Sequence, residues 1–177
     1  MSVQMNASVQ SDLSVQTILV HPNERLRRES SEIIDFDASL MQVFTRLEAT
    51  MQAGPGGVGI AAPQVGDNRR MIVVDCSHSL RPCKHHGLLY MANPVIESVS
   101  GKSLGREGCL SVPDWVGMVH RPAKIQLSYD DEHGVHQHIK AVGFEARVIQ
   151  HEIDHLNGIL FIDKVVSSRD LMRRMSA

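Results

Sequence analysis

The sequence predicts a single domain of the α+β class, with strands in the middle of the chain and helices on either side of them. A length of 177 residues fits one domain. Apolar residues make up 42% and charged residues 21%, the ordinary balance of a globular protein. Strand patterns dominate the middle of the chain and helical patterns flank them, which is typical of the α+β class.

Helices are expected near both ends of this domain. Four apolar residues recur at helical spacing: Leu40, Phe44, Leu47 and Met51. Asp37 stands at the N-cap position of this helix, and the glycine-rich segment Gly54-Pro55-Gly56-Gly57 ends it. A second helix is expected from Phe144 to Asn157, closed by Gly158. Residues Leu171 to Met175 are expected to add a short terminal helix.

Between these helices lie five candidate strands and one irregular loop. The strand candidates are Met71–Asp75, Val95–Val99, Val116–His120, Lys124–Tyr129 and Val135–Val142. The last two flank the turn Asp130–Gly134 and are expected to form a hairpin. The segment Cys76–Gly87 is expected to be an irregular, mobile loop.

Composition and charge exclude several classes of protein. The net charge of −2 gives no electrostatic sign of binding to nucleic acid or to an anionic membrane. No apolar run approaches the ~20 residues of a membrane span. Residues 1–16 contain no Lys or Arg, so we expect a flexible extension rather than a targeting signal, followed by the folded domain over residues 17–177. Three cysteines cannot pair completely, which favours a reducing, cytoplasmic location.

The strongest chemical signal is an H-E-x-x-H motif in the last long helix, from His151 to His155. Residues four apart share one helical face, so both imidazoles can reach one metal ion while Glu152 lies beside them. The helical stripe that contains both histidines predicts that they face the core. The alternative is a pair of hydrogen-bonded core histidines with a surface glutamate.

A third metal ligand has to come from upstream of the motif. Position 161, where a metzincin-like site would place a third histidine, is Phe161, and no Glu follows Glu152. Cys109, in the segment Glu107-Gly108-Cys109-Leu110-Ser111, is the best-placed candidate. Its alternative is a buried structural thiol.

A third segment, Gly57 to Gly66, is rich in small residues and contains one amide, Gln64. It is interpreted either as a tightly packed turn that needs positive φ at its glycines or as backbone that a substrate can approach closely. In the second interpretation, Gln64 donates a hydrogen bond to the substrate.

Together the three segments resemble the signature motifs of bacterial peptide deformylases: G-x-G-[IL]-A-A-x-Q, E-G-C-L-S and H-E-x-D-H-x-x-G. Every fixed position is matched, and the likeness covers roughly residues 17–165. The resemblance implies a compact domain of mostly antiparallel sheets packed around the H-E-x-x-H helix. It also implies a hydrolase that removes the formyl group from the N-terminal methionine of new polypeptides and releases formate.

Carried over by residue, the resemblance implies metal ligands, catalytic groups and a peptide site. The ligands are Cys109, His151 and His155, with Fe²⁺ as the metal and Zn²⁺, Ni²⁺ or Co²⁺ as substitutes. Glu152 is the general acid and base, and Gln64 with the backbone N–H of Leu110 holds the oxyanion. An extended formyl-peptide would add as a strand beside Val58 and Gly59, with its methionine in an apolar pocket near Val58, Val148 and His151. The partners implied are N-formylmethionyl nascent chains and the ribosome near its exit tunnel, with no membrane and no sequence-specific nucleic acid.

Two other functions use the same residues: a metallopeptidase that cuts internal peptide bonds, and a binding protein that has kept the fold without the chemistry. The absence of a downstream ligand disfavours the first, and the presence of Glu152, Gln64 and Cys109 disfavours the second.

A second metal cluster in the loop is also disfavoured, because the spacing of its ligands matches no structural zinc pattern. Its candidate ligands are Cys76, Cys83, His85 and His86. The remaining histidines considered, which are expected to be solvated, are His78, His133, His136 and His138.

Overall fold

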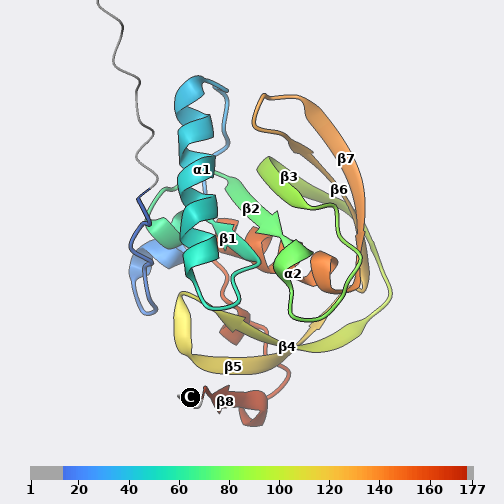
Figure 1. Cartoon of the computed structure of the whole chain (residues 1–177). Helices are drawn as coiled ribbons and strands as arrows, with labels where there is room; N and C mark the ends of the chain where they lie inside the picture. The colour runs from blue at the N-terminus through green and yellow to red at the C-terminus, as the bar shows by residue number, and fades with distance from the viewer. Residues whose placement is uncertain (1–13, 175–177) are drawn as a thin grey trace, which may run out of the picture.

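The computed structural model describes residues 14–174 and forms two antiparallel sheets with two α-helices (Figure 1). One sheet has five strands in the order β1-β2-β3-β6-β7, and the other has three in the order β4-β5-β8. All the strand pairs are antiparallel. The predicted α+β class and the predicted antiparallel sheets are therefore confirmed.

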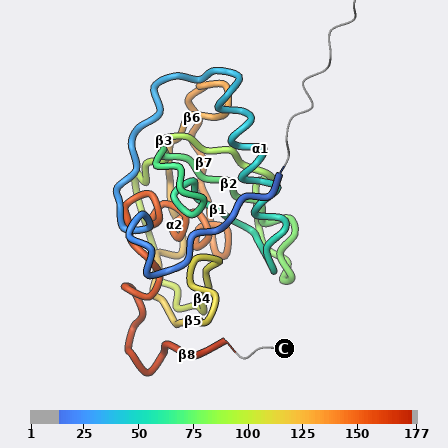
Figure 2. Tube along the Cα trace, turned by 90° about the vertical axis from the view of Figure 1, so that its left-hand side faces the viewer, coloured from blue at the N-terminus to red at the C-terminus, as the bar shows by residue number. Residues whose placement is uncertain are grey.

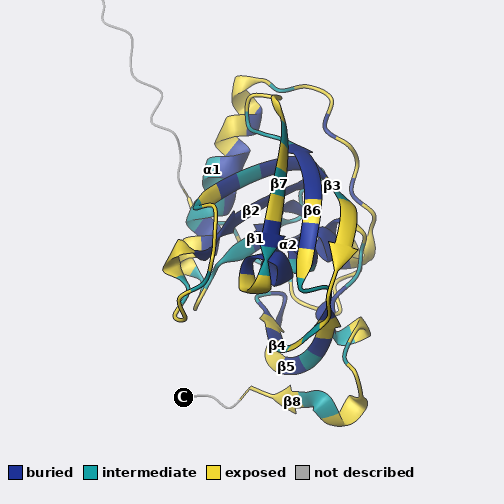
Figure 3. Cartoon of the chain, turned by 90° about the vertical axis from the view of Figure 1, so that its right-hand side faces the viewer, coloured by how far each residue is buried: buried dark blue, intermediate teal, exposed yellow. Residues whose placement is uncertain are grey.

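The larger sheet consists of β1 (Gly59–Ala61), β2 (Met71–Asp75), β3 (Leu88–Ser100), β6 (Lys124–Asp130) and β7 (His136–Val142). The smaller sheet consists of β4 (Ser103–Cys109), β5 (Val112–Arg121) and β8 (Leu171–Arg173). The helices are α1 (Ala38–Ala53) and α2 (Gly143–Leu156). Figure 3 shows buried residues along β6 and exposed ones along β7 and the far end of β3.

The two helices cover opposite faces of β2, which explains why every residue of that strand is buried. Side chains alternate between the faces of a strand. Met71 and Val73 pack in the cluster that includes the apolar face of α1, while Ile72 and Val74 pack in the cluster that includes α2. The apolar run from Met71 to Val74 is thus part of a strand that lies between two helices.

The residues predicted to begin the first helix and to end the last one have these roles in the structure. The side chain of Asp37 accepts hydrogen bonds from the backbone N–H groups of Ser39 and Leu40, at 2.9 and 3.1 Å, and begins α1. Gly158, after the end of α2, has φ of +70°, and a Cβ there would lie 2.4 Å from the carbonyl oxygen of Arg27. The position therefore requires glycine.

The prediction of a terminal helix at Leu171 to Met175 is wrong. Residues Leu171–Arg173 form β8, which pairs with β5 along the lower edge of the molecule (Figure 2). A segment this short has little helical stability of its own, so the partner strand decides its structure. Met175 lies outside the described residues, as do residues 1–13 of the predicted extension.

Candidate metal centre

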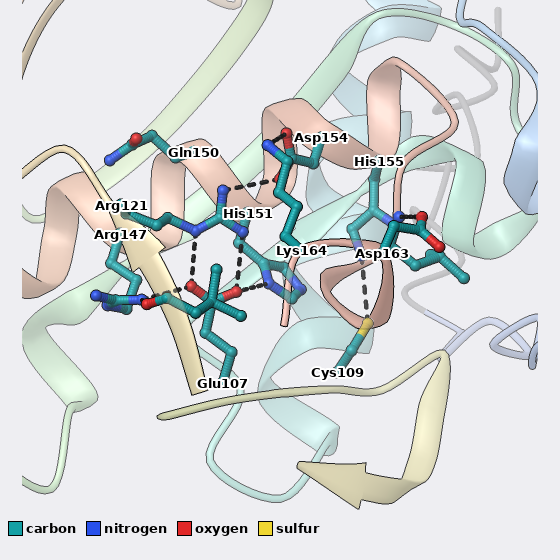
Figure 4. Close-up of polar contacts among 12 residues, drawn as sticks. Glu107, Cys109, Arg121, Arg147, Gln150, His151, Asp154, His155, Asp163 and Lys164 are labelled. Carbon is teal, nitrogen blue, oxygen red and sulfur yellow. Dashed lines mark hydrogen bonds and ion pairs between the residues drawn. The ribbon is translucent and has the colours of Figure 1, made fainter. Parts of the chain in front are cut away.

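Three potential metal ligands converge between the two sheets. Cys109 ends β4, and His151 and His155 lie one turn apart on α2. One ligand atom from each residue lies within 4.8 Å of the other two. The sulfur of Cys109 is 3.2 Å from Nε2 of His155 (Figure 4). A thiolate and two imidazoles at this separation can bind one transition-metal ion.

Each histidine has one ring nitrogen available for an ion. Nδ1 of His151 lies 2.9 Å from Oε2 of Glu107, so Nε2 is its candidate ligand atom. His155 is 1% exposed. Burial, with the proximity of His151, lowers the pKa of His155 well below its ordinary value, so its imidazole is neutral. Neutral imidazole is the form that binds metals.

Glu107 is the centre of a buried ionic network that the sequence did not reveal. It accepts hydrogen bonds from Nε and Nη2 of Arg121 at 2.6 and 2.9 Å, and from Nη1 of Arg147 at 2.7 Å. Nη1 of Arg121 also contacts Asp154 at 2.8 Å (Figure 4). Burial alone would raise the pKa of Glu107, but the hydrogen bonds from Arg121 and His151 outweigh it and hold that pKa well below its usual range. Glu107 therefore orients His151 as a carboxylate.

Glu152 is buried. This excludes the alternative interpretation of the H-E-x-x-H motif, in which the glutamate lies on the surface. Glu152 is 4% exposed, and its Oε2 has no hydrogen-bond partner among residues 14–174. A Cβ on Gly59 would lie 2.6 Å from Oε1 of Glu152 and 2.7 Å from Cγ1 of Val148. Burial raises the pKa of the Glu152 carboxyl to about 7, despite the opposing effect of His151. A carboxyl with that pKa can both accept and donate a proton near neutral pH.

The amide of Gln64 is held in one orientation next to Cys109. Its Oε1 accepts a hydrogen bond from the backbone N–H of Ala61 at 2.9 Å. Its Nε2 is 3.2 Å from Oγ of Ser111 and 3.6 Å from the sulfur of Cys109. The donor end of the amide therefore points towards the ligand cluster. The backbone N–H of Ser111 also donates to the sulfur of Cys109, at 3.3 Å.

A cavity of about 240 Å³ opens onto this cluster. It is lined by all four predicted substrate-binding residues and most of the other predicted site residues: Val58, Gly59, Gln64, Cys109, Leu110, Val148, His151 and Glu152. His155 is almost fully buried and is not part of the lining. The structure thus brings together every residue predicted for the site.

The other candidate ligands lie apart from this centre. Within the described residues, Cys76, Cys83, His85 and His86 do not form a group that could hold a metal. His86 instead contacts Glu145, with Nδ1 2.8 Å from Oε2. The histidines predicted to be solvated have exposed side chains: His78, His133, His136 and His138.

Comparisons with known proteins agree with the geometry. A family model described as polypeptide deformylase matches residues 15–170. A peptide deformylase of Syntrophomonas wolfei is 42% identical over 157 residues, covering 89% of this chain and 97% of the relative. The crystal structure of the enzyme from Thermotoga maritima aligns with a TM-score of 0.80 at 33% identity, covering 87% of this chain and 99% of the other. The enzyme from Synechococcus elongatus, solved in complex with actinonin, aligns with the same TM-score, covering 96% and 89% of the two chains. In residues 14–174, no helix is long and apolar enough to cross a membrane.

Proposed function

The chain belongs to the peptide deformylase family, and from that premise we propose that it is a metal-dependent hydrolase acting on N-formylmethionyl polypeptides. It removes the formyl group from the N-terminal methionine and releases formate. The observation that carries this proposal is one cavity bordered by Glu152, Gln64 and two of the three candidate ligands. The nascent chain on the ribosome, near the exit tunnel, is the natural source of such substrates, which places the enzyme in the cytoplasm.

The residues at the centre fit a divalent metal ion. Cys109 and His155 are buried, and Glu107 holds the ring of His151 so that Nε2 is available. Cys109, His151 and His155 would hold Fe²⁺, with Zn²⁺, Ni²⁺ or Co²⁺ able to replace it. When bound, the ion activates a water molecule and polarises the formyl carbonyl.

Glu152 and two hydrogen-bond donors complete the reaction in this proposal. Glu152 accepts a proton from the attacking water and delivers it to the departing amine, which its pKa of about 7 permits. The negative charge that develops on the formyl oxygen is met by Nε2 of Gln64 and by the backbone N–H of Leu110.

The peptide is positioned by strand addition to β1. This strand pairs with β2 on one side and is the last strand of its sheet, so its outer edge is open to an extended peptide. Gly59 lets the side chains of Glu152 and Val148 pack directly against the backbone of β1, so a peptide paired with β1 lies beside Glu152. The methionine side chain occupies the apolar part of the cavity near Val58 and Val148, where an unbranched, polarizable chain packs well.

The test is an activity comparison on protein purified without oxygen, with its metal content measured. We expect about one iron per chain and rapid release of formate from formyl-Met-Ala-Ser, with no cleavage of casein. Casein cleavage without formate release would identify a metallopeptidase. Metal binding without either activity would identify an inactive relative.

A further inference from the structure

A second, larger cavity of about 1160 Å³ adjoins the catalytic one. The two share part of their lining: Gly56, Gly57, Val58, Arg106, Phe144 and Arg147. The lining of the second cavity includes the loop segment from His78 to Lys84 and, at the start of α2, Gly143 and Phe144. The loop that no signature motif includes therefore faces the route out of the catalytic cavity.

The lining of this second cavity is cationic. It contains Arg81, Lys84 and Arg106, all exposed and without an ion pair to any residue in 14–174. Among the described residues, none of those that line it is Asp or Glu. The other basic side chains of the lining have partners: Arg147 contacts Glu107, and His78 lies 3.5 Å from a carboxylate oxygen of Asp75.

Two carboxylates that contact this loop or lie at its start are also engaged. Asp75 accepts a hydrogen bond from the backbone N–H of Ser77 at 2.9 Å. Glu145 accepts two from His86, from the backbone at 2.7 Å and from the ring at 2.8 Å. These contacts leave the positive charges of Arg81 and Lys84 unneutralised beside the cavity.

A peptide bound along β1 has one direction in which to leave the catalytic cavity. Towards the C-terminal end of β1, Ala61 and Ala62 are fully buried and line neither cavity. In the opposite direction, Gly57 and Val58 are part of both cavities. The residues after the methionine therefore pass over the second cavity.

We propose that this cavity binds the two or three peptide residues that follow the methionine and selects acidic side chains among them through Arg81 and Lys84. This inference rests on the proposed function. A polyanion such as RNA would also be attracted to these charges, but the continuity of the cavity with the catalytic centre favours a peptide.

The test compares kcat/KM for formyl-Met peptides with Glu, Gln or Lys at the second and third positions. We expect the Glu peptide to exceed the Lys peptide about threefold to tenfold at low salt, because two exposed charge pairs contribute modestly. The preference should shrink in about 0.5 M salt. The double variant Arg81→Glu/Lys84→Glu should reverse the order of the peptides, and Arg81→Gln/Lys84→Gln should abolish the preference.

A matched control separates the cavity from the overall charge of the protein. Lys102→Glu/Lys140→Glu makes the same change in net charge at exposed residues outside both cavities and should leave the order of the peptides unchanged. Equal rates for the three peptides, or reversal by the control, would overturn the inference. So would a variant at Arg81 and Lys84 that alters only inhibition by an RNA oligonucleotide, because the cavity would then bind nucleic acid. Formyl-Met-Ala, which has one uncharged residue after the methionine and no third residue, tests the proposed function separately.

Discussion

The substitution Glu107→Gln tests whether the buried ionic network holds the metal centre in place. The carboxylate of Glu107 accepts four hydrogen bonds, from Arg121 twice and from Arg147 and His151 once each. Glutamine keeps the shape of the side chain, but it has one acceptor oxygen and turns its NH₂ group towards a donor. It also removes the negative charge opposite two buried guanidinium groups.

The expected loss of stability follows from the burial of these groups. Removing one partner of a buried ion pair typically costs about 3–5 kcal/mol. Arg121 keeps its contact with Asp154 and Arg147 keeps its bond to the carbonyl of Val119, so we expect the lower value. A loss of about 3 kcal/mol lowers the Tm of a chain of this size by roughly 6–12 °C. Losing the orientation of His151 should weaken metal affinity by about 10- to 100-fold.

Thermal unfolding and metal titration with a chelator measure the two effects. The matched control is Glu97→Gln, the same chemical change at an exposed carboxylate whose only ion pair in residues 14–174 is with His138 at 3.3 Å. That variant should change stability by less than about 1 kcal/mol. If Glu107→Gln matched the control in both Tm and metal affinity, the network would not support the site and the reasoning would be refuted.

Three further predictions concern single side chains. Glu152→Gln should retain its metal and lose at least about 100-fold in turnover, measured as formate release, whereas loss of metal with normal turnover after reconstitution would make Glu152 a ligand. Cys109→Ala should lose the native metal while Cys83→Ser keeps it, as metal analysis will show. Burial raises the pKa of Cys76 from 9.0 to about 12, so this thiol stays protonated in the folded protein while the unfolded chain ionises. Stability should therefore fall as pH rises, by about 1.4 kcal/mol from pH 7 to pH 10, and urea titrations of Cys76→Ala should lack that component.

The sequence predicts the parts of the site that depend on local geometry. His151 and His155 share a helical face because they are four residues apart, and their convergence with Cys109 is confirmed. The buried ionic network escaped prediction because Glu107, Arg121 and Asp154 are far apart in the chain and meet only after folding. The sequence contains one sign of this network: Glu107 is a charged residue inside a signature motif, two positions before the proposed ligand Cys109.

The same distinction applies to the fold. Strands with an apolar run, such as Met71–Asp75, were predicted correctly. The sequence does not predict the strands β1 and β4. Glycine-rich segments such as Gly59–Ala61 show no clear alternation of apolar and polar residues, and they become strands only because they pair with neighbouring strands. Leu171–Arg173 is a strand for the same reason, since its pairing with β5 decides its conformation.

One strand supplies both a candidate ligand and the group that orients another. Glu107 and Cys109 are two residues apart on β4, and both are buried on the same face of it. The register of β4 with β5 shifts between Gly108 and Cys109, and the residues that this shift leaves without a partner are on β5. Helix α2 matches this arrangement, because His151 meets Glu107 while His155 meets Cys109. A shift of β4 along α2 would break both contacts at once, so the smaller sheet that holds β4 in place also determines the geometry of the metal centre.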